Sequence, residues 1–149
     1  ELIVGAVYDP FHKEMYFAEQ GKGAFLNRRK LSVGQVANIT EAVVTTDPAY
    51  DSETMRKHLE LLLKIPQTPP RTMSRGSSVL SICDIASQRS HLYFHLNLQP
   101  WDIAASYLVV KEAGGVGKDF SGKEISLNSR SIIVGNRHLV DEFIAISNK

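Results

Sequence analysis

Residues 99–105, QPWDIAA, place one acidic residue between the only tryptophan of the chain and an apolar run. The run DIAASYLVVKEA, residues 102–113, has helical character, and Gly114 follows it as a glycine commonly follows the end of a helix. The preceding stretch HLYFHL, residues 91–96, has the length and composition of a buried strand. Asp102 therefore stands at a strand-to-helix junction, the unit from which α/β folds are built.

Two roles are open for Asp102. A carboxylate in apolar surroundings is costly unless it is paired, hydrogen-bonded or bound to a metal. As a helix cap, it would accept the free backbone N–H groups of the first turn and interact favourably with the helix dipole. As a ligand, it would offer oxygen to a hard cation such as Mg²⁺, at the strand ends where α/β sites collect. Taken alone, these residues favour the cap.

Outward from this junction, strand patterns alternate with helix patterns. Strand candidates lie at residues 42–48, 71–74, 91–96 and 131–135, and a hairpin is expected around Ser121-Gly122. Helices are expected to begin at Asp51 or Ser52, after Gly76-Ser77-Ser78, and after Asn136, with a proline-rich break at residues 65–70. This alternation predicts an α/β layered sheet.

The first forty residues have a different pattern. Strand candidates at residues 2–8, 14–20 and 24–33 are separated by the turn signals Asp9-Pro10 and Gly21-Lys22-Gly23. Such a meander needs a partner surface to bury its apolar face. We therefore expect residues 1–40 to be antiparallel strands of an N-terminal sheet and residues 41–149 to be a C-terminal α/β domain.

Composition excludes several function classes. The 149 residues carry a formal net charge of +1, which gives no field that would favour nucleic acid or an anionic membrane. No apolar run approaches the length of a membrane span, and the first residues have the pattern of a strand already under way instead of a signal peptide. The single cysteine, Cys83, excludes an internal disulfide and fits a reducing, cytoplasmic setting.

Other polar stretches have both a structural and a functional interpretation. Gly76-Ser77-Ser78 could hold a phosphate at a helix start, or Ser77 could be an ordinary helix cap. Strand alternation puts His91 and His95 on one face, where satisfied strand histidines are the simpler interpretation. Asp9-Pro10 and the DPAYD stretch at residues 47–51 are assigned to turns by composition.

Four segments together resemble one protein family. The segment PWDIAA at residues 100–105, continuing to EAGG at 112–115, is similar to the C-terminal signature of the inositol monophosphatase family. The segments GKGAFLN at 21–27, RGSS at 75–78 and GN at 135–136 resemble further elements of that family, in the same order and spacing. The resemblance covers essentially the whole chain.

This resemblance implies a fold and an activity. The fold would be a layered αβαβα sandwich of the sugar-phosphatase type, and this chain would hold the end of its antiparallel sheet and the C-terminal α/β unit. The activity would be Mg²⁺-dependent hydrolysis of a small phosphate monoester, with metal ions activating water and stabilising the leaving oxygen. Family members are often homodimers. No nucleic-acid or membrane partner is expected.

The resemblance also implies residue roles. Asp102 matches the carboxylate that binds the second metal near the leaving group, and Trp101 matches a packing residue that supports it. Gly76, Ser77 and Ser78 match the loop that contacts substrate. His95 stands where inositol-specific members carry a glutamate that holds a ring hydroxyl. This weakens inositol phosphate as the substrate relative to other sugar, nucleotide or NADP-type phosphates.

The other metal ligands of the family are absent from the expected places. They belong to a Glu-Glu segment and an Asp-Pro-x-Asp-Gly-Thr segment, both upstream of the first strand. We therefore expect this chain to be the C-terminal portion of such an enzyme, with no complete catalytic set and little or no activity alone. Two alternatives stay open: a stand-alone, non-catalytic domain that binds a phosphorylated ligand or a protein, and a structural domain in which Asp102 only caps a helix. The unpaired sheet edge favours association.

Overall fold

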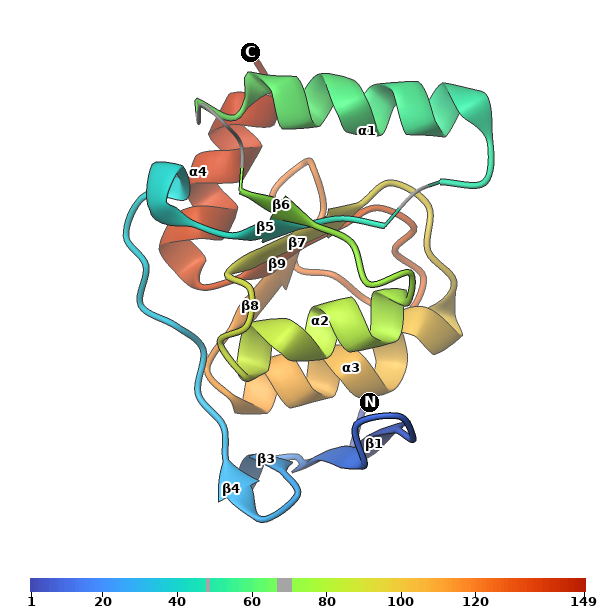
Figure 1. Ribbon diagram of the computed structural model, residues 1–149, viewed down its shortest axis with the longest axis vertical. Helices are drawn as coiled ribbons and strands as arrows, with labels where there is room; N and C mark the ends of the chain where they lie inside the picture. Colours follow the sequence, from blue (N-terminus) through green and yellow to red (C-terminus); the bar gives the residue numbers. More distant parts are fainter. Residues whose placement is uncertain (48, 67–70) are drawn as a thin grey trace.

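The computed structural model describes residues 1–47, 49–66 and 71–149, and it stacks their helices and strands in four alternating layers (Figure 1). The lowest layer in Figure 1 is a sheet of β1 (Val4–Asp9), β2 (Glu14–Glu19), β3 (Gly23–Leu26) and β4 (Arg29–Lys30), covered by α2 (Ser78–Ala86) and α3 (Pro100–Glu112). Above these helices lies a second sheet of β5 (Val44–Thr45), β6 (Thr72–Met73), β7 (Leu92–His95), β8 (Val116–Lys118) and β9 (Ile132–Gly135). The top layer is α1 (Ser52–Lys64) and α4 (Arg137–Ser147), and one 3-10 turn, η1 (Ile39–Glu41), precedes β5.

The first sheet is an antiparallel meander in the order β1-β2-β3-β4, as expected. Its residues alternate, so that Val7 and Tyr16 face α2 and α3 while Val4 and Phe17 stay exposed on the other face. The continuous third strand expected at residues 24–33 is wrong, because a turn at Asn27 divides it. Asn27 has a φ of 53°, and its side chain accepts the Met15 N–H at 2.9 Å, which stabilises the turn.

The second sheet is mixed and has the order β6-β5-β7-β9-β8. β5 runs parallel to β6 and β7, whereas β9 is antiparallel to β7 and β8. The alternation expected for β7 is confirmed: Tyr93 packs with the cluster on the α2 and α3 side, and Leu92 and Phe94 pack with the cluster on the other side. Helices on both faces explain why this strand is buried throughout.

The strand-to-helix junction at QPWDIAA forms as expected, although α3 begins two residues before Asp102, at Pro100. Proline is tolerated there because a first-turn residue needs no N–H partner inside the helix. β1 crosses this helix closely: a Cβ on Gly5 would lie 3.0 Å from the Ala105 carbonyl oxygen. A glycine is therefore needed where the first sheet meets α3.

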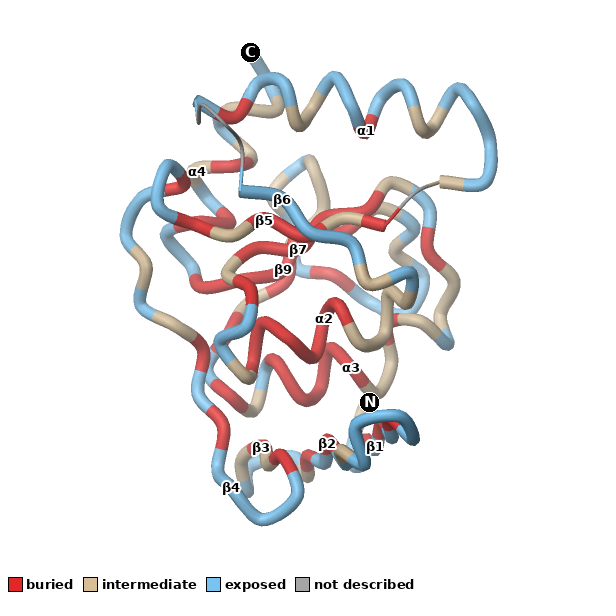
Figure 2. The backbone as a smooth tube through the Cα atoms, in the orientation of Figure 1, coloured by how far each residue is buried: buried red, intermediate tan, exposed pale blue. Residues whose placement is uncertain are grey.

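α1 begins as expected but lies less deeply than its apolar residues suggest. Asp51 caps it by accepting the Thr54 N–H at 2.8 Å. Leu63 is 82% exposed, and the buried residue of the helix is His58. The helix covers only one part of the second sheet, and most of it is exposed in Figure 2. The proline-rich break expected at residues 65–70 lies mostly outside the described residues.

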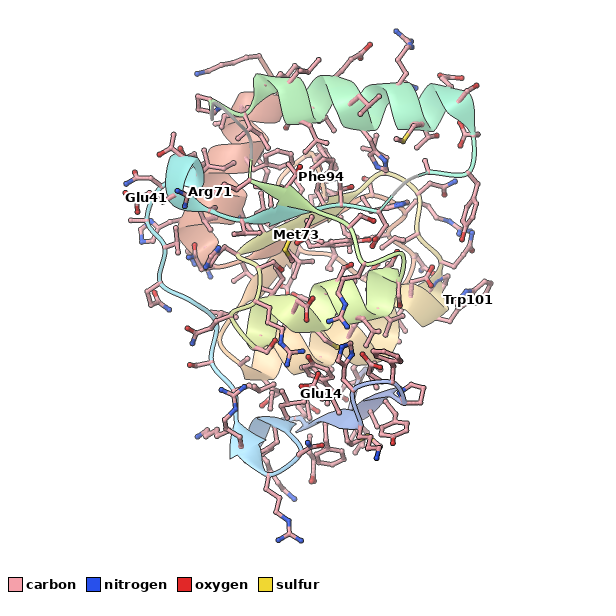
Figure 3. The ribbon with its side chains drawn as sticks, viewed as in Figure 1. Glu14, Glu41, Arg71, Met73, Phe94 and Trp101 are labelled. Atoms are coloured by element: carbon pink, nitrogen blue, oxygen red, sulfur yellow. The ribbon has the colours of Figure 1, made fainter. Side chains whose placement is uncertain are left out.

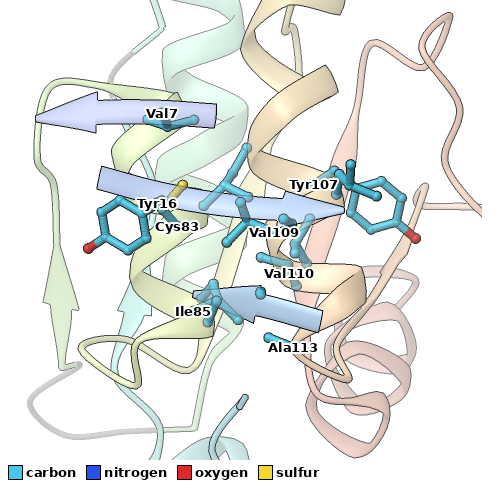
Figure 4. Close-up of a cluster of buried hydrophobic side chains, with 14 of the residues drawn as sticks. Val7, Tyr16, Cys83, Ile85, Tyr107, Val109, Val110 and Ala113 are labelled. Atoms are coloured by element: carbon cyan, nitrogen blue, oxygen red, sulfur yellow. The ribbon is translucent and has the colours of Figure 1, made fainter. Parts of the chain in front are cut away.

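The main core lies between the two sheets. Figure 4 shows Val7 and Tyr16 from the first sheet packed over Cys83 and Ile85 of α2 and over Val109 of α3. Burial raises the pKa of the Cys83 thiol, so this cysteine is a core residue and not a nucleophile. Among the described residues, none of the helices combines the length and the apolar character needed to cross a bilayer.

Candidate active site

A cleft of about 530 Å³ opens where β5 and β7 end and where α2 and α3 begin. Both helices begin at the right of Figure 1. The cleft brings together all five residues that the sequence predicted for a site, which are Gly76, Ser77, Ser78, His95 and Asp102. It is also lined by residues that the sequence did not single out for a site, namely Asp47, Ala49, Tyr50, Val79, Asn97, Leu98 and Gln99. The cleft therefore forms at strand ends and helix starts, where α/β sites collect.

Asp102 occupies the third position of α3 and serves as part of its cap. Its Oδ2 accepts the Gln99 N–H at 2.9 Å. In return, the Gln99 side chain accepts the backbone N–H of Asp102, which completes a capping box. Asp102 therefore takes part in the cap, although Gln99 is the N-cap residue and Asp102 accepts the Gln99 N–H instead of the N–H groups of the first turn. Oδ2 makes this contact, and Asp102 is also one of the residues that line the cleft.

The Gly76–Ser78 loop is held by a carboxylate that the sequence did not predict there. Asp47 Oδ1 accepts hydrogen bonds from the Ser74 hydroxyl at 2.9 Å, the Arg75 N–H at 3.2 Å and the Gly76 N–H at 2.9 Å. Gly76 has a φ of 69°, a left-handed conformation that favours glycine. Ser77 precedes α2 but makes no side-chain cap, so the simple capping interpretation of Ser77 is wrong. The Gly76 N–H is engaged by Asp47 and is not offered to a phosphate.

Asp47 itself is 5% exposed, and its Oδ2 has no hydrogen-bond partner among the described residues. The composition of residues 47–51 predicted a turn and no site residue there. A better signal was available, because Asp47 is the first charged residue after a short buried strand, and polar residues at the carboxyl ends of parallel strands often face a site.

The Arg75 side chain holds the loop through a second set of contacts. The Arg75 guanidinium donates to both carboxylate oxygens of Asp84, at 2.9 and 3.0 Å, and to Asp9 Oδ2 at 3.0 Å. Asp84 lies in α2 and Asp9 ends β1, and both are buried. These ion pairs tie the loop to the first sheet and to the helix that it precedes.

His95 is 6% exposed and lies at the end of β7. Its Nδ1 accepts the Asn97 N–H at 3.0 Å, which leaves Nε2 to carry the proton of the neutral ring. Burial lowers the pKa of His95, and the carboxylates of Asp47 and Asp102 oppose this. His91 lies outside the cleft and accepts the Val43 N–H at 2.9 Å, which confirms that it is a satisfied structural histidine.

The charge of the cleft is unusual for a phosphate site. The described residues that line it include two carboxylates, Asp47 and Asp102, and neither lysine nor arginine. A phosphate dianion would be repelled by this lining. It would be attracted only if cations bound first, so the cleft favours a metal-assisted site over a site of basic side chains.

The donor set fits Mg²⁺ only in part. Asp102 offers one carboxylate oxygen, whereas Mg²⁺ keeps its waters unless several charged oxygens converge. Within the described ranges, the one group of three candidate metal ligands is Asp9, His12 and Glu14, away from the cleft. Arg75 already pairs with Asp9, and Arg89 pairs with Glu14 at 2.5 Å, so this group is explained by ion pairs.

Trp101 differs from what the resemblance implied. It is 74% exposed and projects outward from the start of α3 (Figure 3), so it does not pack against Asp102 within this chain. The side-chain contact that Asp102 makes is with the Gln99 N–H. The supporting role expected for Trp101 is therefore wrong for the chain described.

The model of the inositol monophosphatase family matches residues 1–149. The chain belongs to the inositol monophosphatase family. Inositol monophosphatase 2 of Solanum lycopersicum is 35% identical over 154 residues, which cover 99% of this chain and 57% of that protein. Fructose-1,6-bisphosphatase/inositol-1-monophosphatase of Thermotoga maritima is 34% identical over 149 residues, which cover 100% of this chain and 56% of that protein. The chain thus spans about half the length of these curated relatives.

Solved structures support the same family. The crystal structure of the extragenic suppressor protein SuhB from Bartonella henselae has a TM-score of 0.89 and 28% identity, covering 99% of this chain and 57% of that one. The inositol monophosphatase from Anabaena has a TM-score of 0.87 and 26% identity, covering 97% of this chain and 57% of that one. The layered fold expected for this inositol monophosphatase family member is confirmed.

Proposed function

We propose that this chain is part of a Mg²⁺-dependent phosphomonoesterase that hydrolyses a small phosphate monoester of the inositol, sugar or nucleotide type. The observation that carries the proposal is the cleft. It gathers Gly76, Ser77, Ser78, His95 and Asp102, and its described lining is acidic, so a phosphate needs metal ions in order to bind. The relatives named above are phosphatases, which agrees with this chemistry.

Each residue then has a role that its geometry allows. Asp102 would hold the metal through Oδ1 while Oδ2 keeps the Gln99 N–H. The Gly76–Ser78 loop would position the alcohol part of the substrate, and His95 would donate its Nε2–H to a hydroxyl. Bound Mg²⁺ supplies an activated water and neutralises the phosphate and the leaving oxygen. The remaining carboxylate ligands would come from a segment outside residues 1–149.

The experiment measures phosphate release by the full-length protein with Mg²⁺ and a generic phosphate monoester. Asp102→Asn should lower turnover about a hundredfold or more, because metal assistance contributes several kcal/mol. Asparagine keeps an oxygen for the Gln99 N–H, so the helix cap survives. Asp141→Asn, an exposed change on α4 that does not line the cleft, should leave turnover unchanged. Equal turnover in the wild type and the Asp102 variant would contradict the proposal.

One observation favours a second candidate, a non-catalytic domain that binds a phosphorylated ligand or a protein. The cleft has two carboxylates among its described residues, fewer oxygen ligands than a magnesium site needs. This candidate predicts that the 149-residue chain binds a phosphate monoester by calorimetry without Mg²⁺. The phosphatase proposal predicts that it does not. A homodimer and a cytoplasmic location stay predictions.

A further inference from the structure

Arg75 carries an ion-pair network that the proposed function does not use. Its guanidinium donates to both carboxylate oxygens of Asp84, at 2.9 and 3.0 Å, and to Asp9 Oδ2 at 3.0 Å. The side chains of Asp84 and Asp9 are 1% and 5% exposed, and that of Arg75 is 19% exposed. Three charged groups are therefore buried together at the residue that precedes Gly76 of the cleft loop.

Stability alone does not account for this network. Burial raises the pKa of the Asp84 carboxyl, and the charges of Arg75 and Arg89 oppose this effect. A buried ion pair repays its desolvation cost only where its geometry is very good, and apolar side chains of similar volume often stabilise a fold as well or better. The network does supply direction, because a planar guanidinium that binds a carboxylate through two parallel hydrogen bonds is fixed in orientation.

The backbone and the side chain of Arg75 are held by different parts of the molecule. Asp47 Oδ1 accepts the backbone N–H groups of Arg75 and Gly76, whereas the Arg75 side chain binds α2 and the end of β1. The next two residues, Ser77 and Ser78, line the cleft. The positions of these two serines therefore depend on both sets of contacts.

We propose that Arg75 is a positioning residue for the cleft loop and that Asp9, in the first sheet, acts on substrate binding through it. Neither residue lines the cleft, and neither does any described residue of the first sheet. Asp84 fixes the guanidinium relative to α2, and Asp9 fixes it relative to β1. This inference rests on the proposed function and extends it to a sheet that contributes no side chain to the lining described.

The test removes two charges together, because removing one would leave its partner buried and unpaired. In Arg75→Met combined with Asp84→Leu, Asp9 keeps the Phe11 N–H at 3.0 Å and His12 Nδ1 at 2.8 Å. We expect the full-length protein with Mg²⁺ to show a KM for glycerol 2-phosphate at least about tenfold higher, with kcat changed less than about threefold, because a displaced loop binds the substrate less well. A merely structural role would reduce the folded fraction and so the apparent kcat, and it would leave KM unchanged.

Arg89→Met combined with Glu14→Leu is the matched control. This ion pair also joins the first sheet to a residue next to α2, but Arg89 follows the helix and neither residue lines the cleft. Its KM should stay within about twofold of the wild type. An unchanged KM in the Arg75 and Asp84 double variant, or an equal rise in the control, would overturn the role of Arg75.

A milder variant keeps the test decisive if the double variant does not fold. Arg75→Lys retains the positive charge but loses the paired hydrogen bonds of the guanidinium. We expect it to raise KM about threefold or more while the free energy of urea unfolding stays close to that of the wild type. A wild-type KM in Arg75→Lys would contradict the positioning role.

A double-mutant cycle tests whether Asp9 acts through Arg75. Asp9→Asn keeps an oxygen for the Phe11 N–H and removes the charge that meets the guanidinium. It should raise KM about threefold in the wild type and have no further effect in the Arg75 and Asp84 double variant, because the partner is then absent. An unchanged KM in Asp9→Asn, or the same increase in both backgrounds, would overturn the role of Asp9.

Failure of the proposed function is distinguishable from failure of this inference. If the wild type releases no phosphate, the phosphatase proposal fails, and the same variants are compared by the dissociation constant of glycerol 2-phosphate with Mg²⁺, measured by calorimetry. Weaker binding in the Arg75 variants but not in the Arg89 control supports the positioning role. Equal affinities in all proteins, or binding to none of them, overturn it.

Discussion

His58 places a second imidazole against His95, with 4.7 Å between the ring centroids. Its Nε2 accepts the Leu96 N–H at 3.1 Å, so Nδ1 carries the proton, and this atom is buried without a partner among the described residues. Burial, and then the charge of His95, lowers the pKa of His58 to about 4. The histidine pair is therefore neutral at physiological pH.

This pKa predicts acid sensitivity. Between the ordinary pKa of 6.5 and about 4, the folded protein binds fewer protons at His58 than the unfolded chain, so stability falls as the pH falls. From pH 7 to pH 5 the loss attributable to His58 should be about 1–2 kcal/mol. Urea unfolding of wild type and His58→Gln at both pH values measures it. The variant retains His95 and Asp47, so any acid-induced loss of stability that these two residues cause should be the same in both proteins. An equal acid-induced loss in both proteins would show that His58 is not responsible.

At the scale of elements, the strand-to-helix junctions were predictable and the contacts between distant segments were not. Asp51, Asn136 and Gly114 are local signals, and each ends or begins a helix as expected. The bond from Asp47 to Gly76 joins residues 29 positions apart, and no periodicity or turn rule specifies such a pair. The sequence therefore located the Gly76 loop but missed the residue that holds it.

The Gly76 loop gives a prediction about backbone conformation. An alanine at Gly76 would meet no atom within 4 Å, so its cost would come only from the left-handed φ of 69°. We expect Gly76→Ala to destabilise the protein by about 1–2 kcal/mol. Gly34→Ala is the control, because its Cβ would make an ordinary contact at 3.4 Å with His91 and no positive φ is involved. Equal free energies of unfolding for the two variants would contradict this account.

At the scale of the whole molecule, the outer face of the first sheet is apolar and exposed. Val4, Tyr8, Met15 and Phe17 alternate with buried neighbours along β1 and β2, and their side chains lie on the face that α2 and α3 do not cover. A face of this kind is typical of a surface that contacts another chain or segment. The sequence predicted association from the unpaired edge of the meander, whereas the structure adds an exposed apolar face on its four-stranded sheet.

We expect the 149-residue chain to associate as its concentration rises. Sedimentation velocity over a concentration series should show an increasing mass, and Phe17→Thr should reduce this association, because it removes an aromatic group from the centre of the face. Leu63→Thr, an equally apolar-to-polar change on exposed α1, should have little effect. A chain that remains monomeric at all concentrations would contradict the prediction.

In the proposed function, Asp102 would hold a magnesium ion on which phosphate binding depends. The most direct measurement is a calorimetric titration of the full-length protein with Mg²⁺ in the presence of inorganic phosphate. Asp102→Asn, which keeps the Gln99 cap, should weaken Mg²⁺ binding by at least about tenfold, as the loss of a direct ligand requires. Unchanged Mg²⁺ affinity in this variant would contradict the account and leave Asp102 as a helix cap alone.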